Sequence, residues 1–294
     1  MDARKPVWTS SSFLVYAGSF TVLAAAIGAL GYLSGSYGRG AFAGWAFLVL
    51  AILYAIAHAF RLRGRWLTAG VFAFASVVAW GVFVGALWVW FGWLSPHDFA
   101  SLPFHGFDLG RLSLELLVLA AAFDDRRRFR FPLITSIIVF VGWLFVTDLV
   151  SGGGTWSAVV TLVVGLAYLG AGSASEQPSA FWFHLGAGVL IGASLLYWFH
   201  GGDFRWALNA VASLLYIGNA HRTGRSSWAV LGALGLLAAS THFASEWSHT
   251  PAVPLFTLQS GEAPRDWVPP LVFAFTGFLL VVLGLAVARR RPVA

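Results

Sequence analysis

The residues whose types and spacing could do chemistry are few in this sequence, and the clearest group follows Thr241. On a helix, His242, Glu246 and His249 stand at positions i, i+4 and i+7, which share one face. Two imidazoles and a carboxylate can hold a divalent metal and leave one coordination position open. The segment matches no zinc-binding signature, so the alternative is a group of polar side chains in a hydrated loop. Metal binding at these three residues is therefore a hypothesis.

A second polar group stands at the start of the fourth apolar segment. If a helix begins early there, His105, Asp108 and Glu115 fall on one stripe. Arg111 precedes Glu115 by one turn, and an ion pair at this spacing lowers the cost of placing both charges in a membrane. We expect either a structural ion pair beside a loop or a pathway for an ion, proton or solute, with Glu115 as its first candidate. Asp148 is a weaker candidate because its carboxylate, near a segment end, can reach the surface.

Covalent and cofactor chemistry finds little support in the sequence. The chain has no cysteine, which excludes disulfides, thiolate nucleophiles and cysteine-ligated metal clusters. His184 and His200 share one segment but point about 160° apart on a helix, which disfavours haem. The only lysine, Lys5, precedes the first segment, which disfavours a retinal Schiff base. Because no nucleotide-binding, serine-hydrolase or HExxH motif occurs either, the sequence argues against an enzyme and leaves a divalent metal as the one cofactor to consider.

The elements that must position these side chains are long apolar segments. Of the 294 residues, 59% are hydrophobic and only 10% are charged, whereas a soluble domain carries about 25% charged residues. Ten segments approach the roughly 20 apolar residues that a membrane span needs, although the fourth is short and carries two charges. We therefore expect one integral membrane domain over residues 1–294, an all-α polytopic transmembrane helical bundle of about ten spans. The segments cover residues 12–34, 41–60, 66–94, 109–123, 132–151, 156–173, 180–200, 204–220, 226–245 and 268–288.

Charge placement predicts the orientation of these spans. With ten spans, 14 basic and four acidic residues fall on the side of the two termini, against four basic and eight acidic residues on the other side. The net charges are thus +10 and −4, and the excess of Arg and Lys marks the cytoplasmic side. Both termini are expected in the cytoplasm, in a bacterial-type inner membrane. The overall charge of +6 is then an orientation signal, and the expected partner is the lipid bilayer, with no nucleic acid.

Internal similarity predicts an organisation in hairpins. Ser11–Phe60, Phe131–Ser173 and Ser179–Arg222 each join two apolar segments by a glycine-rich turn and place a tyrosine near the end of the second segment. Two further hairpins have longer loops that share Trp, Ser, Pro and His, in Trp93–Phe104 and Trp247–Phe256. Spans 1–4 (residues 11–130) therefore resemble spans 7–10 (residues 179–294) in parallel orientation, with residues 131–178 as an extra hairpin.

Three observations favour transport of a small solute or ion through a helical bundle: the duplicated hairpins, the glycine-rich helices, and Glu115 near Arg111 within an apolar segment. The first alternative is a structural or accessory subunit of a larger membrane complex, which would explain how few charges lie within the spans. The second is a metal-dependent membrane enzyme that uses His242, Glu246 and His249. A homo-oligomer and other membrane subunits are the partners that these alternatives imply.

Overall fold

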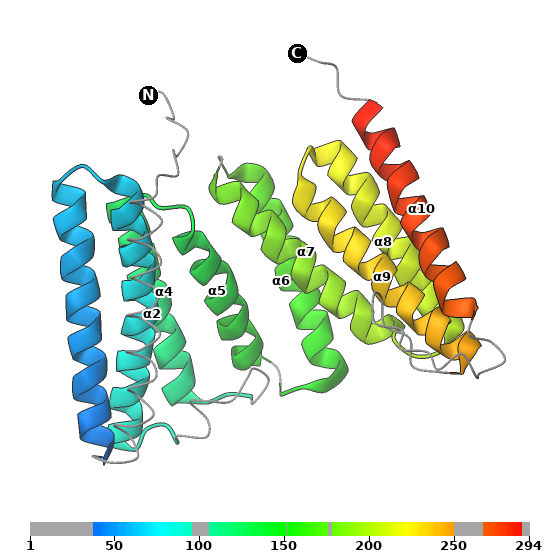
Figure 1. Ribbon diagram of the computed structural model, residues 1–294. Coiled ribbons are helices and arrows are strands. Elements are labelled where there is room, and N and C mark those ends of the chain that lie inside the picture. The colour runs from blue at the N-terminus through cyan, green and yellow to red at the C-terminus, as the bar shows by residue number, and fades with distance from the viewer. Residues whose placement is uncertain (1–37, 96–105, 151, 176–177, 250–266, 290–294) are drawn as a thin grey trace. The chain divides into compact units, whose positions relative to one another are not determined.

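The computed structural model describes residues 38–95, 106–150, 152–175, 178–249 and 267–289, so the predicted span at 12–34 lies outside the described residues. The described residues form nine helices and no strand (Figure 1). The helices are Gly38–Leu62, α2 (Trp66–Phe91), α4 (Leu109–Phe129), α5 (Ile134–Val150), α6 (Gly154–Ala174), α7 (Ser179–Phe199), α8 (Asp203–Thr223), α9 (Ser226–Ser248) and α10 (Val268–Arg289).

These helices coincide with nine of the ten predicted apolar segments. The largest difference is at α4, which continues to Phe129 because the charged residues Asp124–Arg128 extend the helix beyond its apolar part. Five helices, namely Gly38–Leu62, α2, α6, α7 and α9, are long and apolar enough to cross a membrane. The helical architecture of the described residues is consistent with a helical membrane protein, whereas the full count of ten spans stays a prediction.

The chain divides into two compact units. The first contains the Gly38–Leu62 helix, α2, α4 and the first half of α5, up to Val141. The second contains the rest of α5 and helices α6–α10. Within the second unit, α6 packs along α7, α8 packs along α9, and α10 lies beside α9. Helix α7 also contacts both α8 and α9, so these three helices enclose a common space.

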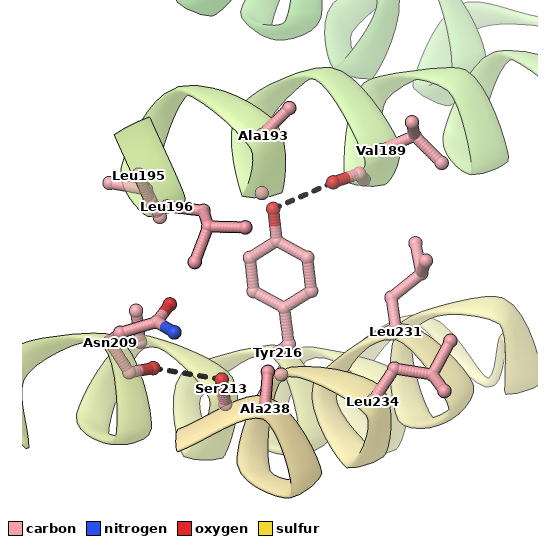
Figure 2. Close-up of a pocket in the computed structure, with 14 residues that line it drawn as sticks. Val189, Ala193, Leu195, Leu196, Asn209, Ser213, Tyr216, Leu231, Leu234 and Ala238 are labelled. Carbon is pink, nitrogen blue, oxygen red and sulfur yellow. Dashed lines mark hydrogen bonds between the residues drawn. The ribbon is translucent and has the colours of Figure 1, made fainter. Parts of the chain in front are cut away.

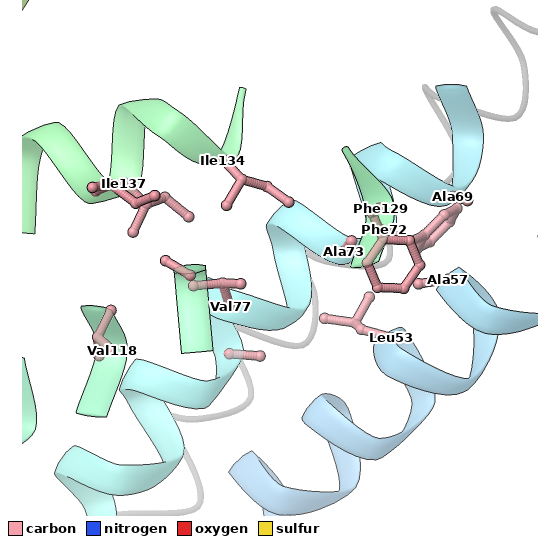
Figure 3. Packing of buried hydrophobic residues seen from close by; sticks show 13 residues of the cluster. Leu53, Ala57, Ala69, Phe72, Ala73, Val77, Val118, Phe129, Ile134 and Ile137 are labelled. Atoms are coloured by element: carbon pink, nitrogen blue, oxygen red, sulfur yellow. The ribbon is translucent and has the colours of Figure 1, made fainter. Parts of the chain in front are cut away.

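The first unit is held together by a cluster of buried apolar side chains (Figure 3). Ala57, Ala69 and Ala73 are fully buried between the Gly38–Leu62 helix and α2, with Leu53 and Phe72 beside them. Such small residues let helix backbones approach closely, which matters in lipid because hydrophobic burial supplies little drive for helix association there.

Two indole groups join α2 to α4 by hydrogen bonds. Trp80 Nε1 donates to the Leu117 carbonyl at 3.2 Å, and Trp88 Nε1 donates to Ser113 Oγ at 2.9 Å. Hydrogen bonds between membrane helices contribute roughly 0.6–2 kcal/mol each. They fix α4, and with it the polar residues near its start, against α2.

The turns of the α5–α6 and α7–α8 hairpins have the same construction. The second helix of each hairpin is preceded by a glycine with positive φ, Gly153 (108°) in one and Gly202 (79°) in the other. Three or four residues later, the indoles of Trp156 and Trp206 each donate, at 3.0 Å, to the backbone carbonyl six residues earlier, at the end of the preceding helix. Each turn therefore closes through a glycine and a tryptophan.

Candidate functional site

A cavity of about 270 Å³ lies between α7, α8 and α9 in the second unit (Figure 2). Its described lining contains mainly small or branched apolar residues and no charged side chain. The volume is close to the lower end of the range for small-molecule pockets, about 300–1,000 Å³. The lining residues are Gly188, Val189, Gly192, Ala193, Leu195 and Leu196 of α7, Asn209, Ala212, Ser213 and Tyr216 of α8, and Leu231, Leu234, Gly235 and Ala238 of α9.

Glycines on α9 set the close packing of the cavity's base. A Cβ added at Gly232 would lie 2.6 Å from the Ser213 backbone oxygen and 2.7 Å from Ile217 Cγ1. One added at Gly235 would overlap Ser213 Oγ. Only glycine lets α8 and α9 meet at this distance. On α7, by contrast, a Cβ at Gly192 would meet only the Tyr216 ring and hydroxyl, at 3.4 Å or more, so this glycine leaves room.

Two of the three polar side chains in the lining are already hydrogen-bonded to backbone. Ser213 Oγ donates to the Asn209 carbonyl at 2.8 Å, one turn earlier on α8. The Tyr216 hydroxyl reaches from α8 to α7 and donates to the Gly188 carbonyl at 2.9 Å (Figure 2). The Tyr216 ring also packs edge-on against Trp228, with centroids 4.9 Å apart, which helps to hold the tyrosine in place.

The third polar side chain, the carboxamide of Asn209, is the group that is available to a ligand. Asn209 is 6% exposed, and within the described part of the chain its carboxamide makes no hydrogen bond to protein. Figure 2 shows this carboxamide on the same side of the Tyr216 ring as Leu196. The carboxamide borders the cavity, so a ligand group inside the cavity can form hydrogen bonds with it.

The polar residues predicted on α4 occupy two kinds of position, and His105 lies outside the described residues. Asp108 caps the helix, because its carboxylate accepts a hydrogen bond from the Arg111 backbone N–H at 2.8 Å. The predicted ion pair is present: Arg111 Nε lies 3.5 Å from Glu115 Oε1, with side chains 10% and 7% exposed. The pair forms as its spacing predicted and is buried, and its role in a pathway stays a prediction.

The polar residues predicted on α9 are not gathered into a metal site within the described part of the chain. His242 Nε2 lies 3.0 Å from the Asp203 carboxylate, and its ring stacks on Trp206 with a centroid distance of 4.9 Å. Helix α9 ends at Ser248, and His249 follows it in the left-handed conformation with φ 59°. His242, Glu246 and His249 as metal ligands therefore stay a hypothesis that this geometry does not support.

The expectation that Asp148 reaches the surface is wrong. Its side chain is fully buried in α5, next to the equally buried Thr147. The Thr147 hydroxyl bonds back to the Trp143 carbonyl at 2.9 Å, and the Trp143 indole donates to Thr161 of α6 at 3.2 Å. Helix rotation, which the distance from the segment end does not reveal, directs Asp148 inward.

Sequence reasoning missed Asp125, a buried carboxylate in the charged segment that follows the apolar part of α4. Asp125 is 6% exposed and accepts a hydrogen bond from Ser76 Oγ of α2 at 3.3 Å. Burial raises the pKa of the Asp125 carboxyl to about 6, and nearby Asp124 adds to this effect. The Ser76 hydrogen bond and the positive charges of Arg128 and His58 act in the opposite direction.

The surroundings of Asp125 are a polar and aromatic cluster at one end of the first unit. Arg128 pairs with Asp124 at 2.8 Å and donates to the Tyr54 hydroxyl at 3.0 Å. The His58 ring lies 4.5 Å from that of Tyr54 and 5.3 Å, edge-on, from that of Phe129. The cluster thus links the Gly38–Leu62 helix to α4, while Asp125 itself faces α2.

Comparison with known proteins assigns no family or function to this chain. No family model matches the sequence, and no curated protein or solved structure is significantly similar to it. The helical fold of the described residues and the five long apolar helices are consistent with a helical membrane protein. Any more specific function has to be argued from the cavity and the polar residues themselves.

Proposed function

We propose that the chain is a multi-pass membrane transport protein that binds a small solute in the cavity between α7, α8 and α9. The observation that carries the proposal is the buried Asn209 carboxamide, available for hydrogen bonding inside a cavity of about 270 Å³. Polar groups within membrane helices are expensive to insert and are functional by default. The Asn209 side chain does not offset this insertion cost by stabilising the fold, because within the described residues it forms no hydrogen bond to another helix.

The lining indicates the chemistry of the solute. No charged side chain of the described chain borders the cavity, so a bare ion would lack the charge or the several oxygen ligands that replace its hydration shell. A carboxamide offers two N–H donors and a carbonyl acceptor, which suits an uncharged group such as a hydroxyl or an amide. The solute that fits is therefore small, uncharged and mostly apolar.

The proposal includes the orientation and the repeat organisation that the sequence predicts. Ten spans in a bacterial-type inner membrane, with both termini in the cytoplasm, remain the topology that the charge distribution favours. The shared glycine and tryptophan of the two hairpin turns support a duplication of hairpins. Glu115, with Arg111, Asp108 and His105, remains our candidate set for a pathway in the first unit.

Flux into proteoliposomes tests the proposal. Purified protein is reconstituted, and entry of a panel of small uncharged alcohols and amides is compared with entry into protein-free vesicles. The matched variants are Ala212→Phe, which fills the cavity from α8, and Ala207→Phe, which adds the same ring at an exposed α8 position outside the lining. We expect at least one panel member to enter faster with protein, and Ala212→Phe but not Ala207→Phe to abolish the difference.

Two results would contradict the proposal. If solute entry is never faster than into protein-free vesicles, the chain does not transport these solutes. If the faster entry persists in Ala212→Phe, the solute does not pass through this cavity. Recovery of other proteins in fixed proportion during purification in mild detergent, together with absence of flux, would favour the accessory-subunit alternative.

A further inference from the structure

The geometry points to a bilayer-dissolved, uncharged amphiphile as the solute, with its hydrogen-bonding head on Asn209 and its chain leaving the cavity between α7 and α9. This inference rests on the proposed function and specifies its substrate class. It uses three features of the cavity: the exposure of its rim, the chemistry of its base and its volume.

The rim of the cavity is apolar and exposed. Val189 and Leu196, which are two turns apart on one face of α7, are 47% and 39% exposed, and Leu234 of α9 is 57% exposed. In a membrane, exposed apolar side chains on long apolar helices contact lipid chains. A cavity bordered by such side chains on both sides opens toward the hydrocarbon, so its ligand can enter sideways from the bilayer.

The base of the cavity is polar, and its polarity is concentrated at one group. The hydroxyl hydrogens of Ser213 and Tyr216 are used by the Asn209 and Gly188 carbonyls, so these oxygens can only accept further bonds. The Asn209 carboxamide can both donate and accept. A ligand head with one donor and one acceptor, as in an alcohol or a primary amide, satisfies this base. A charged head would enter it without a counter-ion.

The volume fixes how much of the ligand lies inside. At about 30 Å³ per water-sized group, a cavity of about 270 Å³ holds roughly nine such groups. A polar head and the first carbons of a chain fill this space. A longer chain would extend past Val189, Leu196 and Leu234, whose exposed side chains border the cavity, into the surrounding lipid.

Photolabelling in phosphatidylcholine vesicles tests the inference. The full chain is reconstituted with hexadecanamide that carries a diazirine beside its head group, and adducts are mapped by mass spectrometry. Hexadecane with the same diazirine serves as the control for contact with lipid-facing surfaces. Three variants are compared with the parent chain: Asn209→Leu, which keeps the size but removes the hydrogen bonds, Ala212→Phe and Ala207→Phe.

We expect the amide probe to label the cavity-lining segments of α7, α8 and α9 more than the hydrocarbon probe does. Asn209→Leu should lower amide labelling there roughly three- to tenfold, the loss expected for about one neutral hydrogen bond, and should leave hydrocarbon labelling unchanged. Ala212→Phe should lower labelling by both probes, whereas Ala207→Phe should not. Since an apolar residue replaces a polar one in Asn209→Leu, insertion of that variant is not at risk.

Several outcomes would overturn the inference. Equal labelling by the two probes, or no effect of Asn209→Leu, removes the head-group recognition. Absence of adducts from the lining segments shows that another part of this chain or a second copy covers the rim. If a water-soluble panel member is transported in the flux assay while amide labelling fails, the transport proposal is supported and the inference of a lipid-soluble substrate is contradicted. Labelling without flux would mean that the amphiphile binds in the cavity and would contradict transport.

Discussion

Replacing Asp125 by asparagine should stabilise the protein at pH 8 and leave its stability at low pH unchanged. Asp125 is buried against α2 with Ser76 as its hydrogen-bond partner, and burial raises the pKa of its carboxyl to about 6. In the unfolded chain this carboxyl has its ordinary pKa near 4. The folded protein therefore binds the proton more tightly than the unfolded chain does, and the stability that this supplies is present below pH 4 and lost as pH rises through 6.

The magnitude follows from the difference between the two pKa values. The folded and unfolded pKa values differ by about two, and each pKa unit corresponds to about 1.4 kcal/mol. The free energy of unfolding can therefore fall by at most about 3 kcal/mol between low and high pH. Because Asp125 stands at the polar end of α4, water screens part of its charge, and about 1–2 kcal/mol is the expected effect. Asparagine keeps a polar group for Ser76 and has no charge to bury.

Unfolding by a denaturing detergent, followed by circular dichroism at pH 5 and pH 8, measures this difference. The comparison variant is Asp124→Asn, which removes a neighbouring carboxylate whose side chain is 53% exposed and pairs with Arg128. Because burial contributes more than Asp124 to the raised pKa of Asp125, this variant should keep most of the pH dependence of the parent chain. The parent chain should lose stability from pH 5 to pH 8, and Asp125→Asn should lose less. If Asp125→Asn lowers the stability at pH 8, or if the pH dependence of the two chains is equal, the reasoning about this carboxyl is refuted.

Three further predictions concern the helix contacts. Gly232→Ala should destabilise the second unit by about 1–3 kcal/mol because its Cβ would meet the Ser213 backbone oxygen, whereas Gly170→Ala, with no atom within 4 Å, should not; the same detergent titration compares them. Asp108→Ala should cost about 1 kcal/mol by removing the N-cap of α4, measured likewise, and retention of full stability would contradict the cap. Glu115→Gln should lower solute flux in proteoliposomes, and unchanged flux would remove this carboxylate from the pathway.

The helices could be predicted from the sequence because long apolar segments are a strong signal, and the boundaries follow where glycines and charges interrupt them. The Arg111–Glu115 pair could be predicted too, since its spacing alone brings the two side chains together. Whether a side chain near the end of a segment is buried or exposed was harder to predict from the sequence. Asp148 lies near the end of α5 yet is buried, because distance along a helix says nothing about rotation around it.

The burial of Asp125 could have been predicted from the helical periodicity of α4. Arg111, Glu115, Val118, Ala122, Asp125 and Phe129 are buried residues of α4 that repeat at steps of three or four. A run of charges like the one around Asp125 is typical of a solvated surface, whereas the periodicity continues the buried stripe of the apolar part. Periodicity therefore predicts the direction of a side chain better than local composition does.

The polar side of the cavity carried a similar signal, since Asn209, Ser213 and Tyr216 repeat at i, i+4 and i+7 on α8. The cavity itself could not be predicted, because it depends on what stands opposite each small residue. On α9, Gly232 faces the α8 backbone and permits contact. On α7, Gly192 faces only the Tyr216 ring and hydroxyl, and so leaves space.

Small residues in these helices consequently serve two purposes that composition does not separate. At a contact such as Gly232, a larger residue forces two helices apart, so its effect appears in stability. At the cavity lining, for example Ala212, a larger residue fills space that the fold leaves open, so its effect appears in ligand occupancy. If the cavity binds the solute, Ala212→Phe should therefore abolish flux at nearly unchanged stability, and Gly232→Ala should lower stability first. Parallel loss of stability and flux in both variants would mean that the space between α7, α8 and α9 is a packing defect and not a binding site.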